Sequence, residues 1–198
     1  MGESVLELSE EKTIITNIND SVDILEWSFI KFGGKLLIQP SRKSNQKVTK
    51  SLSRTVKYYQ EASQELLIIK LNQITRGWAE YHHCICAKKT YALIDHRLWE
   101  MLWKWAKRRH PRKGKKWIKN RYWHPKGKRE WSFRTDKVIL YQMMDMSIVR
   151  IRSLDLKKNP FLDSEYFEHR RKQQKKDKET AYPSHTAAHS GYYALKKR

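Results

Sequence analysis

The clearest pattern along the chain is helical, with apolar residues recurring every three or four positions in two long segments. These positions are Leu71, Ile74, Trp78, Tyr81 and Ile85 in the first segment, and Ile94, Leu98, Leu102 and Trp105 in the second. Such stripes occupy one face of a helix and pack against other helices. Together with a shorter upstream segment they predict helices over residues 47–60, 64–86 and 90–108, packed as a three-helix bundle. Asn72 is expected to cap a new helix within the second segment.

Upstream of the helices, the pattern is typical of short strands. Residues 22–30 form a run rich in β-branched and aromatic side chains, and Gly33-Gly34 predicts a hairpin turn into the strand 35–38, which Pro40 ends. The segment from Ser41 to Lys50 is rich in Ser, Lys, Asn and Gln, which predicts an exposed linker.

Downstream of the helices, Pro111 and Gly114 predict the end of the third helix. Alternating apolar residues over 129–141 predict a hairpin that turns at 134–137. After Arg170 the chain loses periodicity, which predicts a disordered basic tail over 171–198. The predicted fold class is mainly α with small β elements: a three-helix bundle followed by a small basic α+β domain.

Charge then narrows the class of partner. The 198 residues include 42 Lys and Arg against 21 Asp and Glu, a net charge of +21 that attracts polyanions. No apolar run approaches the ~18 to 20 residues that a membrane span requires, so no membrane partner is predicted. The N-terminus lacks the pattern of a secretory signal, and Cys84 and Cys86 are spaced for reduced thiols rather than a disulfide. A cytoplasmic protein is expected.

The strongest functional signal is the window from Lys104 to Arg129, which holds thirteen Lys or Arg residues and no Asp or Glu. Cations with interleaved aromatics can neutralise phosphates and stack unpaired bases. Trp105 is expected in the core instead. The predicted phosphate contacts are Arg76, Lys104, Lys107, Arg108, Arg109, Arg112, Lys113, Lys115, Lys116, Lys119 and Arg121, and the predicted stacking residues are Trp117, Tyr122 and Trp123.

No catalytic residue, metal site or cofactor is predicted. Two-metal polymerase or nuclease chemistry needs clustered carboxylates, and the chain contains no adjacent Asp pair. The run His82-His83-Cys84-Ile85-Cys86 contains residues that bind zinc, but it lacks the usual cysteine spacing and a second cysteine pair.

Several strings resemble bacterial group II intron reverse transcriptases with a maturase domain. They are Gly34 to Ser41 (GKLLIQPS), Leu71 to Tyr81 (LNQITRGWAEY), Leu93 to Asp95 (LID), Leu98-Trp99, Leu102 to Pro111 (LWKWAKRRHP), Asn159-Pro160 and Glu165 to Arg170 (EYFEHR). The resemblance implies a palm remnant over 1–41, a thumb-like helical bundle over 42–110 and a maturase-specific RNA-binding domain over 111–170. Glu7 to Thr13 is similar to the last part of the palm, and Glu26 stands where the family has glycine.

The same resemblance implies that the family's Tyr-x-Asp-Asp polymerase motif would lie upstream of this chain and its HNH endonuclease downstream. The expected function is therefore binding of structured group II intron RNA to assist splicing, without a polymerase site in this chain. Two alternatives remain open. The chain is one piece of a split or truncated RNA-directed DNA polymerase that needs a separate palm-containing chain, or it is a general basic protein that binds template-primer duplex or DNA.

Overall fold

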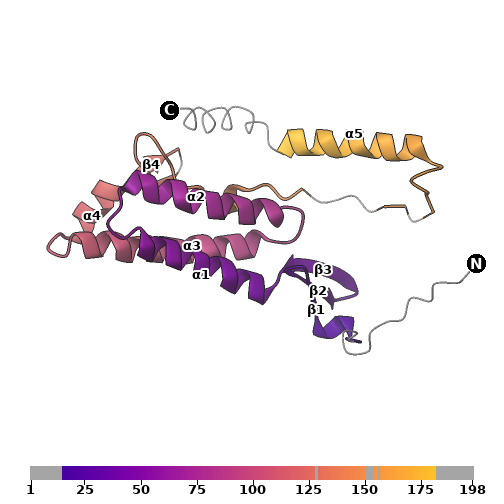
Figure 1. Ribbon diagram of the computed structural model, residues 1–198, viewed down its shortest axis with the longest axis horizontal. Helices are drawn as coiled ribbons and strands as arrows, with labels where there is room; N and C mark the ends of the chain where they lie inside the picture. Colours follow the sequence, from indigo (N-terminus) through magenta and orange to yellow (C-terminus); the bar gives the residue numbers. More distant parts are fainter. Residues whose placement is uncertain (1–14, 128, 150–153, 156, 182–198) are drawn as a thin grey trace, which may run out of the picture.

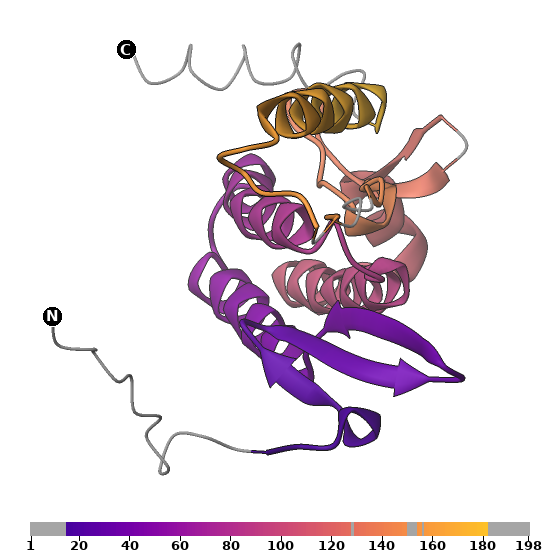
Figure 2. The same ribbon diagram turned by 90° about the vertical axis from the view of Figure 1, so that its right-hand side faces the viewer.

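The computed structural model describes residues 15–127, 129–149, 154, 155 and 157–181. Three long helices lie side by side, with a three-stranded sheet at one end of them (Figures 1 and 2). A short helix and a two-stranded hairpin lie at the opposite end. The molecule is mainly helical with small antiparallel sheets, which confirms the predicted fold class. In the described residues, no helix is long and apolar enough to cross a bilayer.

The N-terminal sheet follows a short 3-10 helix, η2 (Ile18–Asp20), and contains β1 (Val22–Ile24), β2 (Trp27–Phe32) and β3 (Lys35–Pro40) in sequential antiparallel order. Gly33 and Gly34 form the turn between β2 and β3 with φ of +56° and +76°, a left-handed backbone that glycine adopts without a steric penalty. The predicted hairpin turn and the strand end at Pro40 are both confirmed. The segment from Glu7 to Thr13 lies outside the described residues.

The three long helices are α1 (Arg42–Tyr58), α2 (Gln64–Tyr81) and α3 (Lys88–Arg109). They pack together around a shared core, as the apolar stripes predict. The predicted linker from Ser41 to Lys50 is wrong, because the Ser41 side chain accepts a hydrogen bond from Ser44 N and starts α1 at residue 42. Helix α1 packs against the core through Val48, Leu52 and Val56. The apolar periodicity of these three residues is hard to recognise in the sequence because most other residues of the helix are polar.

The predicted helix start at Asn72 is also wrong. Asn72 lies within α2, where its buried side chain donates to Ile139 O and accepts from Tyr141 N. The amide therefore joins α2 to a later segment of the chain that has no ladder of its own in which to satisfy these backbone groups.

Beyond α3 the chain forms α4 (Lys115–Tyr122), β4 (Trp123–Lys126) and β5 (Arg129–Phe133). The hairpin predicted over 129–141 is only partly right, since β5 pairs with β4, which precedes it. Downstream of β5, a single bridge joins Arg134 to Ile139. The pattern revealed the strand but not its partner, because the His124-Pro125 pair hides the strand character of β4.

The last elements are a 3-10 turn, η3 (Met143–Asp145), and helix α5 (Ser164–Ala181). The predicted disordered tail is wrong for residues 171–181, which continue α5. Lys, Gln and Glu are good helix formers even without apolar periodicity, so a polar composition did not by itself mean disorder. Residues 182–198 lie outside the described part of the chain.

Residues on both sides of position 110 share one hydrophobic core. The indole of Trp105 in α3 meets the rings of Tyr122 and Phe133 edge to face, with centroids 5.4 and 6.0 Å apart. Such contacts add about 0.5–1.5 kcal/mol beyond the area they bury. Helix α4 and the β4–β5 hairpin are therefore anchored on the end of α3. This packing fixes the position of the charged segment that connects α3 to α4.

Candidate nucleic-acid interface

A basic patch covers the end of α3, the turn after it and helix α4. We define the basic patch as Lys104, Lys107, Arg108, Arg109, Arg112, Lys113, Lys115, Lys116, Lys119 and Arg121. All of these side chains are exposed except Lys119, which is half-buried. Within the described ranges, no carboxylate forms an ion pair with any of them.

The folding of this segment concentrates the charge at one end of the molecule. Lys107, Arg108 and Arg109 lie in the last turn of α3, where cations interact favourably with the negative end of the helix dipole. Lys115 and Lys116 instead begin α4, where the dipole disfavours positive charge. The N-cap residue of α4 is Gly114, which has no side chain to accept a hydrogen bond from the first turn of the helix. The start of α4 is thus electrostatically unfavourable for the protein alone and favourable for a bound anion.

Arg109 differs from the rest of the basic patch because it also holds the scaffold together. Its guanidinium lies 4.7 Å from the centroid of the Trp105 ring and donates hydrogen bonds to the carbonyl oxygens of Gln60 and Ala62. These carbonyls belong to the connection between α1 and α2. Replacing Arg109 would therefore disturb the fold as well as the surface.

The predicted stacking residues separate into two kinds. Trp117 is 40% exposed, with Lys113 Nζ 5.5 Å from its ring centroid and His110 against its edge. Tyr122 and Trp123 are only 6% and 2% exposed, so their predicted role in base stacking is wrong. Ile118 and Tyr122 are four residues apart and face the core together, a helical spacing that the sequence contained.

Arg76 does not belong to the basic patch. It lies twelve residues, or about 18 Å of helix, along α2 from Gln64, whose side chain donates to Tyr122 O at the end of α4. Its guanidinium packs 5.0 Å from the ring centroid of Tyr141, and its buried Nε has no hydrogen-bond partner in the described part of the chain. The predicted phosphate contact at Arg76 is therefore not brought together with the others.

A second basic surface was not predicted, because residues 41–50 were interpreted as a linker and the charge of the helix predicted over 47–60 was not considered. Helix α1 contains no Asp or Glu. All of its Lys and Arg side chains are exposed, and these are Arg42, Lys43, Lys47, Lys50, Arg54 and Lys57. Lys47 is paired with Glu26 at 2.7 Å. Since α1 packs against α3, positive charge extends from the basic patch along the bundle.

Two buried titratable groups lie away from the basic patch. Burial lowers the pKa of His82 to about 4, and the Nε2 of this imidazole lies 3.2 Å from Ser44 Oγ. Burial raises the pKa of Asp95 to about 6, although its carboxylate accepts hydrogen bonds from Met143 N and Met144 N. Both groups connect secondary-structure elements, so they have structural roles.

Cys84 and Cys86 follow the end of α2 at Tyr81, rather than lying within the helix predicted to reach residue 86. Both thiols are free, and burial raises the pKa of Cys84. Among the residues that the structure describes, no three His, Cys, Asp or Glu side chains are arranged to hold a metal ion.

In a comparison with known families, residues 45–123 match the group II intron, maturase-specific domain. This range runs from α1 to the first residue of β4 and includes the whole basic patch. It starts in the segment predicted as a thumb-like bundle and ends in the segment predicted as the maturase domain, so the boundary between 110 and 111 remains a prediction. No curated protein matches the chain.

Proposed function

We propose that this chain, whose residues 45–123 are a group II intron maturase-specific domain, binds group II intron RNA and assists its splicing. In this proposal the RNA supplies the chemistry of splicing, and the protein stabilises the folded form of the intron. The chain needs no catalytic residue, metal or cofactor of its own for that role.

The observation that carries the proposal is the unpaired charge of the basic patch. No carboxylate among the described residues neutralises these cations, so their charge remains available to attract phosphate. Phosphate contacts release counterions and supply most of the affinity of non-specific nucleic-acid binding. The basic patch also lies entirely within the residues that match the family.

The shape of the surface favours RNA over duplex DNA as the ligand. The basic patch lies on the end of α3, the turn after it and helix α4, and the partly exposed Trp117 lies among its residues in α4. Folded RNA is recognised mainly through its backbone, its shape and its unpaired bases, whereas sequence-specific DNA binding places an element in the major groove. Positive charge along α1 adds a second side on which a folded RNA could lie.

The test uses a variant in which three cations of the basic patch become neutral, Arg108→Gln, Lys115→Gln and Lys116→Gln. Arg109 is retained because of its structural contacts. The matched control neutralises three exposed lysines outside the patch, Lys31→Gln, Lys35→Gln and Lys157→Gln, so that both variants have the same net charge.

Binding is measured with a group II intron RNA, with a duplex DNA competitor present at physiological salt. The proposal predicts that the patch variant binds the RNA at least tenfold more weakly, and that the control variant stays close to wild type. Equal losses in both variants would mean that net charge alone attracts the RNA. Displacement by equal amounts of duplex DNA would favour a general DNA-binding protein instead.

A further inference from the structure

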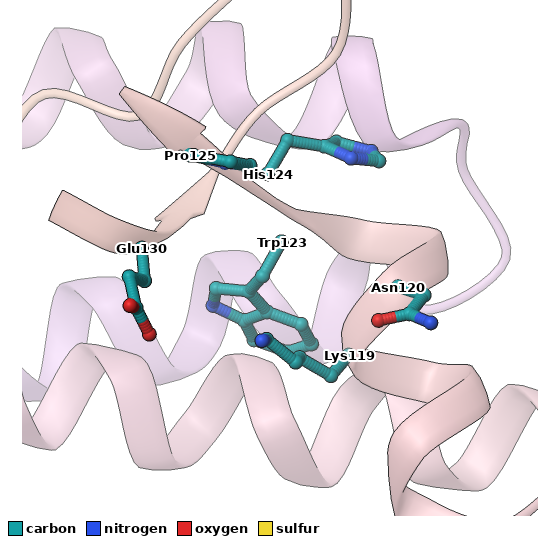
Figure 3. A pocket seen from close by; sticks show the side chains of 6 residues that line it. All are labelled: Lys119, Asn120, Trp123, His124, Pro125 and Glu130. Atoms are coloured by element: carbon teal, nitrogen blue, oxygen red, sulfur yellow. The ribbon is translucent and has the colours of Figure 1, made fainter. Parts of the chain in front are cut away.

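A pocket of about 510 Å³ lies beside the basic patch, between α4 and the β4–β5 hairpin (Figure 3). Its volume falls within the range of roughly 300–1,000 Å³ typical of small-ligand sites. The lining residues are Lys119, Asn120, Trp123, His124, Pro125 and Glu130. Lys119 belongs to both the basic patch and the pocket, so the two surfaces adjoin at this residue.

The pocket contains one acidic side chain in a strongly basic neighbourhood. Glu130 is exposed, and its carboxylate has no ion pair or hydrogen bond in the structure's described portion. Lys119 and Asn120 provide N–H donors in the same pocket. The pocket therefore offers two acceptor oxygens on Glu130 and N–H donors on Lys119 and Asn120. These groups fit a ligand that has two adjacent donors and a separate acceptor.

A second observation points to the same place. Trp123 is 2% exposed, and its buried indole Nε1 has no hydrogen-bond partner among the residues that the structure describes. Figure 3 shows the nitrogen-bearing edge of this indole on the side of Glu130. Leaving a buried donor unpaired is unfavourable, so a polar group that entered beside Glu130 after a small side-chain movement would gain this donor as well.

The donor and acceptor arrangement selects among the four RNA bases. Guanine has two adjacent N–H donors, at N1 and N2, which match the two oxygens of one carboxylate. Its neighbouring O6 accepts a hydrogen bond, and Lys119, Asn120 or the Trp123 indole can donate it. Adenine and cytosine place a ring-nitrogen lone pair next to their amino group, and uracil places carbonyls on both sides of its N–H. Each of these would set an acceptor against Glu130.

We infer that this pocket binds an unpaired guanine of the RNA whose phosphates lie on the basic patch. Lys119 joins the two surfaces, and the rings of His124 and Pro125 line the pocket beside the base. The inference rests on the proposed function and adds base specificity to it. A sequence-independent patch positions the RNA, and Glu130 discriminates between bases.

The experiment measures binding of the full chain to short uridine oligonucleotides that differ only at the central residue. That residue is guanosine, inosine, adenosine, cytidine or uridine, and fluorescence anisotropy gives the Kd of each. The expected preference for guanosine over adenosine is roughly tenfold to a hundredfold, the range for one bidentate contact to a base. Inosine lacks the 2-amino group and is expected to bind with intermediate affinity.

The decisive variant is Glu130→Gln, with Glu80→Gln as a matched control that removes the same charge from the exposed end of α2. Glu130→Gln is expected to abolish the guanosine preference, while both variants bind the all-uridine oligonucleotide alike. A guanosine preference that survives Glu130→Gln, or salt-dependent binding with no base preference in wild type, overturns the inference and leaves the proposed function standing. Failure to bind every oligonucleotide and the intron RNA would overturn both.

Discussion

The two ends of the helical bundle differ in whether their polar side chains are paired within the protein. At the sheet end, Ser44 Oγ accepts from Trp78 Nε1 at 3.1 Å, donates to Glu26 at 3.0 Å and lies 3.2 Å from His82 Nε2. Lys47 completes this junction by pairing with Glu26. At the α4 end, the cations of the basic patch form no ion pair with a carboxylate among the described residues, and Arg109 alone among them donates hydrogen bonds to the fold.

The difference distinguishes groups that stabilise the fold from groups available to a ligand. Buried polar groups are costly unless they are paired, so the network around Ser44 is explained by the stability of the junction alone. An exposed cluster of like charges gives no stability and repels itself. The unpaired end is consequently where binding is expected, and each prediction below tests one side of this contrast.

The largest effect is expected from the two tryptophans at the α4 end. Trp123→Ala should lower the free energy of unfolding by about 3–5 kcal/mol, because it leaves a cavity between α3 and β5. Trp117→Ala should lower the free energy of unfolding by only about 1 kcal/mol, because it loses the contacts to His110 and Lys113, but should weaken RNA binding by about 1–3 kcal/mol. Denaturant unfolding and RNA titration separate the two effects. Similar unfolding curves for both variants would contradict the assignment of Trp123 to the core.

The next effect concerns pH, to which His82 and Asp95 respond in opposite directions. The folded state lowers the pKa of His82 to about 4, so its contribution to stability is lost as pH falls from about 6.5 to 4. The folded state raises the pKa of Asp95 to about 6, so its contribution is lost as pH rises from about 4 to 6. In the wild-type protein these slopes largely cancel between pH 4 and 6.

Asp95→Asn removes the contribution of Asp95 to the pH dependence of the free energy of unfolding. The variant's free energy of unfolding should then rise by roughly 2–3 kcal/mol between pH 4 and 6.5, which is the contribution of His82 alone. Urea unfolding at several pH values measures it. If the variant and the wild-type protein show the same pH dependence over this interval, Asp95 does not carry a raised pKa.

The network at the sheet end should be sensitive to one hydroxyl. Ser44→Ala leaves the Trp78 indole N–H and His82 without their shared partner, at a cost of about 1–3 kcal/mol of unfolding free energy. Ser53→Ala in the same helix is the matched control, and alanine's helix propensity should make it neutral or slightly stabilising. Equal thermal stability of the two variants would show that the Ser44 network does not hold the junction.

The smallest effect is a stabilising one, at the turn between β1 and β2. Leu25 is 80% exposed with φ of +48°, a backbone conformation that glycine adopts more easily. Leu25→Gly should raise the free energy of unfolding by about 1 kcal/mol, and the Leu25 carbonyl can still accept from Tyr81 OH. The exposed Leu36 in β3 is the control, where glycine should destabilise. A lower stability of Leu25→Gly than of the wild-type protein would contradict the conclusion that the backbone of Leu25 is strained.

Glu26 shows how a departure from the family pattern is accommodated. It stands where the resemblance implies glycine and adopts φ of +72°. Its carboxylate bonds to Ser44 and Lys47, and these bonds lower its pKa. The contacts offset a backbone conformation that is unfavourable for glutamate.

The sequence predicted the helices and the basic patch because both depend on local patterns. Apolar periodicity identified α2 and α3, and the absence of acids identified the cations that the structure leaves unpaired. The burial of Tyr122 was missed although Ile118 and Tyr122 have a helical spacing, and the pairing of β5 with β4 was missed although only two residues separate these strands. The linking role of Asn72 instead depends on Ile139 and Tyr141, which are 67 and 69 residues away in the chain. Such contacts leave no periodic signal. The charge on α1 was visible in the sequence, but residues 41–50 were assigned to a linker, so its cations were not recognised as one helical surface.

The most direct test of the account is the salt dependence of RNA binding. A plot of log Kd against log salt concentration should lose a slope of about 0.7–0.9 for each phosphate contact removed, or roughly 2–3 in total for Arg108→Gln with Lys115→Gln and Lys116→Gln. The control with Lys31→Gln, Lys35→Gln and Lys157→Gln should keep the wild-type slope. If the patch variant keeps that slope as well, the exposed end of α3 and helix α4 do not hold the RNA.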